Sequence, residues 1–182
     1  MSKMTEDILT EEQKHMVQVW ENHTRYEFET KSVEDTMRTM EDNPYVNNVP
    51  TMTGGFGKEG VKYFYSKLFI PQKPDDTEVE LISRTIGTHQ IVDELIFKFT
   101  HNIQMDWMLN GIEPTGKRVE IPLVAIVGFH NGKIISEHIY WDQASILVQI
   151  GLLSSDKLPV YGIEITHKLR ELKSRNQTQI NN

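Results

Sequence analysis

The sequence contains no cysteine, which excludes disulfide bonds, thiolate metal sites and cysteine nucleophiles. Basic residues are in the minority, because 19 lysines and arginines stand against 26 aspartates and glutamates, for a formal net charge of −7. Such an acidic excess disfavours binding to a nucleic-acid backbone or an anionic membrane. We therefore expect neither of them as a partner.

Long apolar runs are also missing. The longest, Ile121 to Phe129, is far too short to cross a bilayer. The stretch from Met1 to Lys14 is polar and acidic and lacks the apolar segment of a secretory signal. Together with the absence of cysteine, these features predict a cytoplasmic protein.

Several enzyme motifs are absent or incomplete. The seven histidines show no HExxH or similar zinc spacing, and no G-x-S-x-G elbow of a serine hydrolase occurs. The segment Gly54 to Glu59 matches a phosphate-binding loop only in part, because the upstream glycine is missing and Glu59 replaces the required serine or threonine. We expect neither a metal nor another cofactor.

The helical signals lie in the N-terminal half. Thr10 to Gln13 has the form of a capping box, which predicts a first helix from Glu11 to Phe28. Ser32 opens a second helix that buries Met37 and Met40, and Asn43-Pro44 ends it. A glycine-rich loop, Thr53 to Gly57, leads into a third helix with an apolar stripe of Val61, Phe64, Tyr65 and Leu68.

The second half is rich in β-branched and aromatic residues at a period near two. We expect a short strand at Tyr45–Val49, a last helix at Ala144–Leu153, and long strands at Val79–Ile86, Gln90–Met105, Arg118–His130 and Lys133–Trp141. Helices followed by an antiparallel meander predict an α+β fold. One domain should cover residues 1–172, with a polar tail over residues 173–182. Because the strands are apolar on both faces, helices should cover one face and a second subunit the other, which predicts a homodimer.

Asn131-Gly132 predicts a two-residue hairpin turn, because both positions of a type I′ turn need positive φ. A regular hairpin then pairs Phe129 with Ile134, Ala125 with His138, Leu123 with Tyr140 and Ile121 with Asp142. His138, Tyr140 and Asp142 would line one face, and Glu137, Ile139 and Trp141 the other. Only one set can face an internal cavity unless a bulge intervenes.

Several segments together resemble the SnoaL-like branch of the nuclear transport factor 2-like superfamily. They are Trp20–His23, Thr39–Val46, Val49–Thr51, the glycine-rich loop, Gly111–Lys117, Gly132–Ile134, Trp141–Ser145 and Gly151–Leu153. The similarity runs from about Glu12 to Leu153. It implies a cone in which a curved antiparallel sheet wraps around helices and encloses one pocket. It also implies polyketide cyclase-like chemistry without metal or cofactor, with an aspartate as general acid–base.

Polar residues on apolar stripes mark the candidate pocket. His23 and Glu27 follow Val19 and Trp20 on one helix face, although an ion pair at the core rim would explain them equally well. His101 shares the parity of its apolar neighbours, and its pKa range suits proton transfer, whereas a structural histidine is the alternative. Asp106 and Trp107 follow in an irregular stretch whose facing cannot be read.

Asp142 most resembles the aspartate of the family, so the resemblance favours the face with His138, Tyr140 and Asp142 for the cavity. Asp142 could also cap the last helix. Asp142 or His101 would then move the proton. Tyr140 or His138 would stabilise an oxyanion, while Trp107 and Trp141 would shape an apolar wall.

The main hypothesis is a cofactor-independent lyase, isomerase or cyclase that acts on a small, apolar or aromatic, carbonyl-bearing molecule. The alternatives are a non-catalytic module for ligand binding or dimerisation and a hydrolase that activates water with the same carboxylate.

Overall fold

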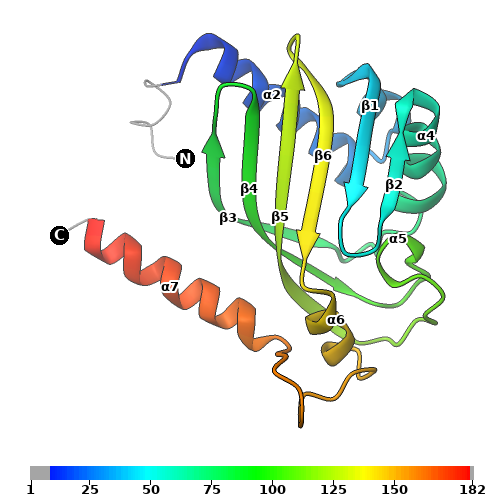
Figure 1. Cartoon of the computed structure of the whole chain (residues 1–182), viewed down its shortest axis with the longest axis vertical. Coiled ribbons are helices and arrows are strands. Elements are labelled where there is room, and N and C mark those ends of the chain that lie inside the picture. Colours follow the sequence, from blue (N-terminus) through cyan, green and yellow to red (C-terminus); the bar gives the residue numbers. More distant parts are fainter. Residues whose placement is uncertain (1–8, 181–182) are drawn as a thin grey trace.

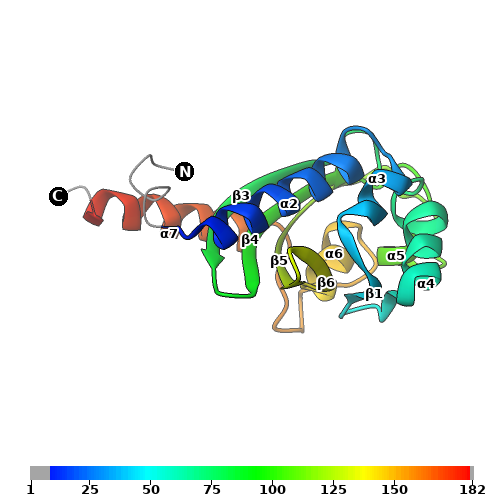
Figure 2. The same cartoon turned by 90° about the horizontal axis from the view of Figure 1, so that it is seen from above.

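The computed structural model describes residues 9–180, and the side chains of residues 9–175 (Figures 1 and 2). Its helices are α2 (Glu11–Phe28), α3 (Val33–Arg38), α4 (Gly57–Tyr63), the π-helical η1 (Phe64–Phe69), α5 (Asp106–Leu109), α6 (Gln143–Gln149) and α7 (Glu164–Ile180). Its strands are β1 (Met40–Asn48), β2 (Thr53–Phe56), β3 (Glu78–Ile86), β4 (Gln90–Thr100), β5 (Arg118–His130) and β6 (Lys133–Trp141). The predicted α+β class is confirmed.

The strands form one curved sheet in the order β2-β1-β6-β5-β4-β3. All neighbours are antiparallel except β1 and β6, which are parallel. Helix α2 crosses behind the sheet in Figure 1 and covers its concave face, where Trp20 Nε1 donates a hydrogen bond to Asp93 on β4 at 2.8 Å. Among the described residues, no helix is long and apolar enough to span a membrane.

The first helix begins as predicted. Thr10 Oγ1 accepts a hydrogen bond from the Gln13 amide at 3.2 Å, while the Gln13 side chain accepts one from the Thr10 amide at 3.0 Å. This capping box satisfies amide groups that have no partner within the helix. Met16, Trp20, His23 and Glu27 form the buried face of α2, so two polar residues lie on the stripe that packs against the sheet.

The expected second helix is too long. It ends at Arg38, and the chain enters β1 at Met40, which is buried in the strand. Pro44 lies inside β1, where the pairing with β6 is interrupted between Met40 and Tyr45. A proline lacks the amide hydrogen that strand pairing needs, so it is tolerated at this irregularity and does not mark the end of a helix. The expected glycine-rich loop is the short strand β2.

The hairpin of β5 and β6 has the predicted turn but not the predicted register. Asn131 and Gly132 both have positive φ, at 49° and 75°, and Phe129 pairs with Ile134. The next pair is Gly128 with Ser136, so Ile135 is an extra residue that forms a bulge. Beyond it every partner is shifted by one: Ala125 pairs with Ile139, and Leu123 with Trp141.

The bulge reverses the face that each side chain of β6 occupies. Glu137, Ile139 and Trp141 point to the concave side, and His138 and Tyr140 to the convex side. The preferred assignment of His138, Tyr140 and Asp142 to the cavity is therefore wrong. The cause is the single inserted residue, because side chains alternate along a strand and one extra residue inverts them.

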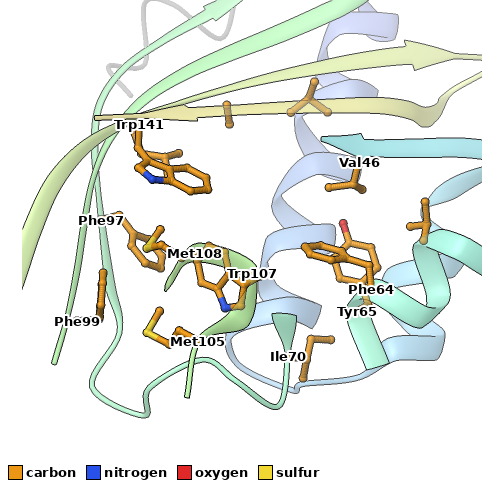
Figure 3. Packing of buried hydrophobic residues seen from close by; sticks show 14 of the residues in the cluster. Val46, Phe64, Tyr65, Ile70, Phe97, Phe99, Met105, Trp107, Met108 and Trp141 are labelled. Carbon is orange, nitrogen blue, oxygen red and sulfur yellow. The ribbon is translucent and has the colours of Figure 1, made fainter. Parts of the chain in front are cut away.

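Aromatic side chains dominate the core beneath the concave face. Figure 3 shows Trp107 of α5 lying between Phe97 of the sheet and the Phe64–Tyr65 pair of η1. The Trp107 ring centroid is 6.1 Å from that of Phe97 and 6.1 Å from that of Trp141, in edge-to-face contacts. These contacts fix α5 against the sheet, and Phe69 of η1 packs on Trp107 with ring centroids 5.0 Å apart.

Helix α7 was not predicted, and the expected polar tail from Lys173 is part of it up to Ile180. It lies against the convex side near β3, where Arg170 binds the carboxylates of Glu80 and Glu120 at 3.0 and 2.9 Å, and it extends past the sheet in Figures 1 and 2. Most of its residues are charged or polar, and the stripe of Ile165, Leu169 and Leu172 is narrow, so it was not recognised as a helix. Association through the convex face into a homodimer stays a prediction.

The contact of β2 with α4 generates a test of the fold. A Cβ atom at Gly55 would overlap the main chain of Gly60, whereas a Cβ at Gly60 would stand 3.7 Å from the nearest atom of Gly55. We expect Gly55→Ala to lower the free energy of unfolding by about 1–3 kcal/mol. Gly60→Ala should raise it by up to about 1 kcal/mol, because alanine favours a helix. Urea denaturation measures both, and equal effects would contradict the close approach.

Candidate active site

A cavity of about 390 Å³ lies between α2, η1 and the concave face of the sheet. Its walls are largely aromatic, with Trp20 and Phe28 from α2, Phe64 and Phe69 from η1, Phe97 from β4 and Trp107 from α5. This volume falls in the range of small-molecule sites, roughly 300–1,000 Å³. The exposed residues among its lining, such as Glu21, Arg25, Val79 and Leu81, place the mouth between α2 and the edge strand β3.

Two buried carboxylates meet at the inner end of the cavity. Glu27 of α2 and Glu137 of β6 both line it, with side chains only 6% and 4% exposed. His23 lies behind them, fully buried, with Nε2 3.1 Å from Oε1 of each carboxylate. Tyr65 completes the group, because its hydroxyl donates a hydrogen bond to Glu137 Oε1 at 2.9 Å and lies 3.1 Å from His23 Nε2. We call these four residues the inner cluster.

The hydrogen bonds around His23 indicate that its ring carries two protons. Nδ1 lies 2.6 Å from Thr39 Oγ1, and the Thr39 hydroxyl donates its own hydrogen to the Thr36 carbonyl oxygen at 2.6 Å. Nδ1 must therefore be the donor in the first bond. Nε2 faces carboxylate oxygens and a phenol oxygen whose hydrogen is already directed to Glu137, so Nε2 must also donate.

Electrostatics lead to the same protonation state. Burial by itself would lower the pKa of His23, but the nearby Glu27 and Glu137 carboxylates outweigh it and raise that pKa to about 10. Burial raises the pKa of Glu27, against the opposing effect of the His23 charge. Burial also raises the pKa of Tyr65, with the two carboxylates adding to the effect. The phenol is thus a proton donor to Glu137 and stays protonated.

Lys73 is a second buried cation close to the cluster. Its ammonium donates to the main-chain oxygen of Glu27 and lies 3.9 Å from the centre of the Phe28 ring. Burial lowers the pKa of Lys73 to about 8. Lys73 does not line the cavity, so it holds the end of α2 and does not face a guest.

A further polar group lies on the Glu21 side of the cavity. Asp93 of β4 accepts two hydrogen bonds from Arg84 of β3, at 2.7 and 2.8 Å, in addition to the one from Trp20. Arg84 also binds Glu21 at 3.0 Å. This bidentate pair matches each charge with the opposite one inside an apolar wall.

The structure places some of the expected site residues at the cavity and others away from it. Glu27 and Trp107 line the cavity, and His23 supports it from behind. Trp141 is buried and packs against Trp107, as a support for the wall. Asp106 opens α5, where it accepts hydrogen bonds from Gln72 and Gln104 away from the cavity.

Four other expected residues lie elsewhere. His138 bonds to Tyr45 on the convex side, and Tyr140 is 42% exposed there. Asp142 caps α6, with its carboxylate accepting the Ser145 amide at 3.1 Å, so the alternative interpretation as a cap describes it. His101 is buried outside the cavity lining, because β4 ends at Thr100 and the chain turns toward Thr115. Burial lowers its pKa.

Sequence reasoning missed Glu137, Tyr65 and Asp93 as site residues. Asp93 carried a readable signal, because it shares strand parity with Ile91, Leu95 and Phe97 and so had to lie on an apolar face. Tyr65 was seen only as part of an apolar stripe. Glu137 was assigned to the outer face, because no pattern revealed the bulge.

The inner cluster is also the group of described residues that could hold a metal ion. His23 Nε2 and one oxygen each of Glu27 and Glu137 lie within 4.8 Å of one another. A cation there would have to displace the proton on Nε2. The expectation that no metal is needed stays a prediction.

The charge on His23 predicts a pH dependence of stability. Because its pKa rises from 6.5 to about 10 on folding, its stabilising contribution is complete below pH 6.5 and is lost as the pH approaches 10. Lys73 opposes this trend in part of the range, since its pKa falls to about 8. We expect the free energy of unfolding to fall more steeply between pH 6.5 and 10 in the parent protein than in His23→Gln.

Urea denaturation across this pH range measures the difference between the two proteins, and His130→Gln is the control, because its side chain is 61% exposed. The control should keep the slope of the parent protein. Identical slopes in all three proteins would contradict a charged His23.

Solved structures resemble this chain in fold. A putative SnoaL-like polyketide cyclase from Jannaschia is 17% identical, with a TM-score of 0.61 over 80% of this chain and 98% of that one. An NTF2-like protein of unknown function from Burkholderia pseudomallei is 12% identical, with a TM-score of 0.58 over 75% and 98%. SalBIII, described as an epoxide hydrolase/cyclase-like enzyme in pyran ring formation in salinomycin, is 17% identical, with a TM-score of 0.53 over 74% and 95%.

These similarities establish the nuclear transport factor 2-like fold. Among curated proteins, none matches the sequence significantly. The family model of the SnoaL-like polyketide cyclases matches residues 13–150, which include all but the first two residues of α2, the whole sheet and every residue of the inner cluster. The chain therefore belongs to the SnoaL-like polyketide cyclase family.

Proposed function

We propose that this protein is a cofactor-independent enzyme of the lyase, isomerase or cyclase type, which moves a proton on a small, mainly apolar molecule held in the central cavity. The observation that carries this proposal is the pair of buried carboxylates, Glu27 and Glu137, that share one imidazolium at the wall of an aromatic cavity. Carboxylates held out of water beside a guest are suited to general acid–base catalysis.

Glu137 is the proposed base. Its Oε1 atom accepts a hydrogen bond from Tyr65 and lies 3.1 Å from His23 Nε2, which together hold the carboxylate in one orientation. Its other oxygen accepts no hydrogen bond from the described residues and can take a proton from the guest. Glu27 is the second carboxyl group, and its raised pKa suits a group that returns a proton. His23 keeps the net charge of the inner cluster low as the proton moves, which a water-excluding site requires.

The fold relationship to SalBIII, a protein described in pyran ring formation, supports a ring-closing reaction as one member of this class. Two alternatives from the sequence stay open to the same experiment. A binding module would hold its ligand unchanged, and a hydrolase would add water to it.

The test compares matched carboxylate-to-amide variants. Wild-type protein, Glu137→Gln and Asp142→Asn are incubated with a panel of hydroxy-epoxides and hydroxy-ketones of about the size of two fused rings, and products are identified by mass spectrometry. We expect at least one conversion, slowed by about 100-fold or more in Glu137→Gln, in line with the loss of a general base. Asp142→Asn should react at the wild-type rate, because asparagine caps a helix as well as aspartate does.

Mass identifies the reaction class. An unchanged mass means isomerisation or ring closure, a loss of water means a lyase, and a gain of water supports the hydrolase. Unaltered ligands together with a raised melting temperature would instead support the binding module. Loss of activity in Asp142→Asn but not in Glu137→Gln would overturn the assignment of the base.

A further inference from the structure

We infer that the inner end of the cavity selects guests that present a hydroxyl group or another hydrogen-bond donor, and discriminates against guests that offer only a carbonyl or ether oxygen. The inference deepens the proposed function, since it names the substrate class of the same site. It departs from the carbonyl-bearing molecule that the sequence suggested. Its basis is a count of which donors and acceptors along the cavity wall are already engaged.

The single-hydrogen donors along the wall are engaged within the protein. Trp20 Nε1 donates to Asp93, the Tyr65 hydroxyl donates to Glu137, and Trp107 Nε1 donates to the main-chain oxygen of Gln72. The hydroxyls of Thr24 and Thr77 likewise donate to main-chain oxygens. Each of these groups has one hydrogen to give, so none can also bind a guest without breaking an internal bond.

The free capacity at the inner end consists of acceptors. Oε1 of Glu27 and Oε1 of Glu137 receive the hydrogen bonds of the inner cluster, and among the described residues neither Oε2 atom receives one. Among the described residues, His101 Nε2 is the one fully buried side-chain polar atom without a hydrogen-bond partner. The two Oε2 atoms also have no partner, so each must keep some accessible surface, and both carboxylates line the cavity. Both Oε2 atoms are therefore open to a guest.

The donors with several hydrogens are Arg25, Arg84 and Asn48, and each lies away from this end or is partly engaged. Arg25 is exposed at the mouth and donates to Asn22 Oδ1 at 3.2 Å. Arg84 is held by Asp93 and by Glu21, whose side chain is 55% exposed. The Asn48 amide donates to Thr53 Oγ1 at 3.1 Å.

A carbonyl oxygen against Glu137 would bring two acceptors together out of water, whereas a hydroxyl would supply the hydrogen that Oε2 lacks. A site built this way discriminates against an acceptor-only analogue.

Glu137→Gln should invert this selectivity. Tyr65 donates to the Oε1 position and the protonated His23 Nε2 lies 3.1 Å from it, so the amide oxygen of glutamine is favoured in that place. The amide NH₂ group then occupies the Oε2 position and faces the cavity. The substitution exchanges an acceptor for a donor at the same point, with almost no change in size.

The test uses three probes that share one ring system: 2-naphthol, 2-methoxynaphthalene and 2-acetonaphthone. Isothermal titration calorimetry of the full chain at pH 7 should show 2-naphthol binding to the wild type roughly tenfold or more tighter than either other probe, which is the effect of one unpaired buried acceptor. Glu137→Gln should bind 2-acetonaphthone more tightly than 2-naphthol. Glu94→Gln, a carboxylate on the convex side of β4 that accepts the Ser83 hydroxyl, should keep the wild-type order.

Equal affinities, a wild-type preference for the ketone, or no saturable binding of 2-naphthol would overturn the inference. An unchanged order in Glu137→Gln would overturn it as well. Because binding of these probes is read without any conversion, failure of the inference is distinguishable from failure of the proposed catalytic role.

Discussion

The position of His23 between two buried carboxylates is the constraint on which the site depends. An uncompensated carboxylate in an aromatic cavity would take up a proton, because moving its charge out of water is costly. One imidazolium in contact with Glu27 and Glu137 offsets that cost for both. Thr39 fixes the ring from behind, so a single side chain joins α2, the end of α3, η1 and β6. The charge balance of the cavity and the packing of the fold are thus the same set of contacts.

Much of the fold could be predicted from the sequence, because local rules decide it. The capping box at Thr10 sets the start of α2, and the Asn131-Gly132 pair sets the β5–β6 turn. Helix α7 was missed because Ile165, Leu169 and Leu172 form only a narrow apolar stripe among many charged and polar residues. Pro44 was taken for the end of a helix, although it lies at a break in strand pairing that only the neighbouring strand reveals.

The site was harder to predict than the fold, because one residue decided it. A regular hairpin brings Asp142 and His138 toward the cavity, and the bulge at Ile135 replaces them with Glu137. His23 and Glu27 were found because helical spacing is indifferent to sheet register. The expectation that His101 lines the cavity relied on strand alternation with Phe99, and this alternation does not extend past Thr100, where the strand ends. The facing of polar residues was therefore predicted better from helical spacing than from a strand register counted from the hairpin turn.

The location of the cavity mouth has a consequence for how guests exchange. One lip is the strand β3, which pairs with β4 on one side and, within residues 9–180, has no strand on the other. Outside the segment that the family shares, α7 braces this strand through Arg170 on Glu80 and through Lys173 on the main-chain oxygen of Leu81. Because α7 holds the edge strand β3 from the outside, it restricts how far this strand can move when a guest enters or leaves. The C-terminal helix thus influences guest exchange without lining the cavity.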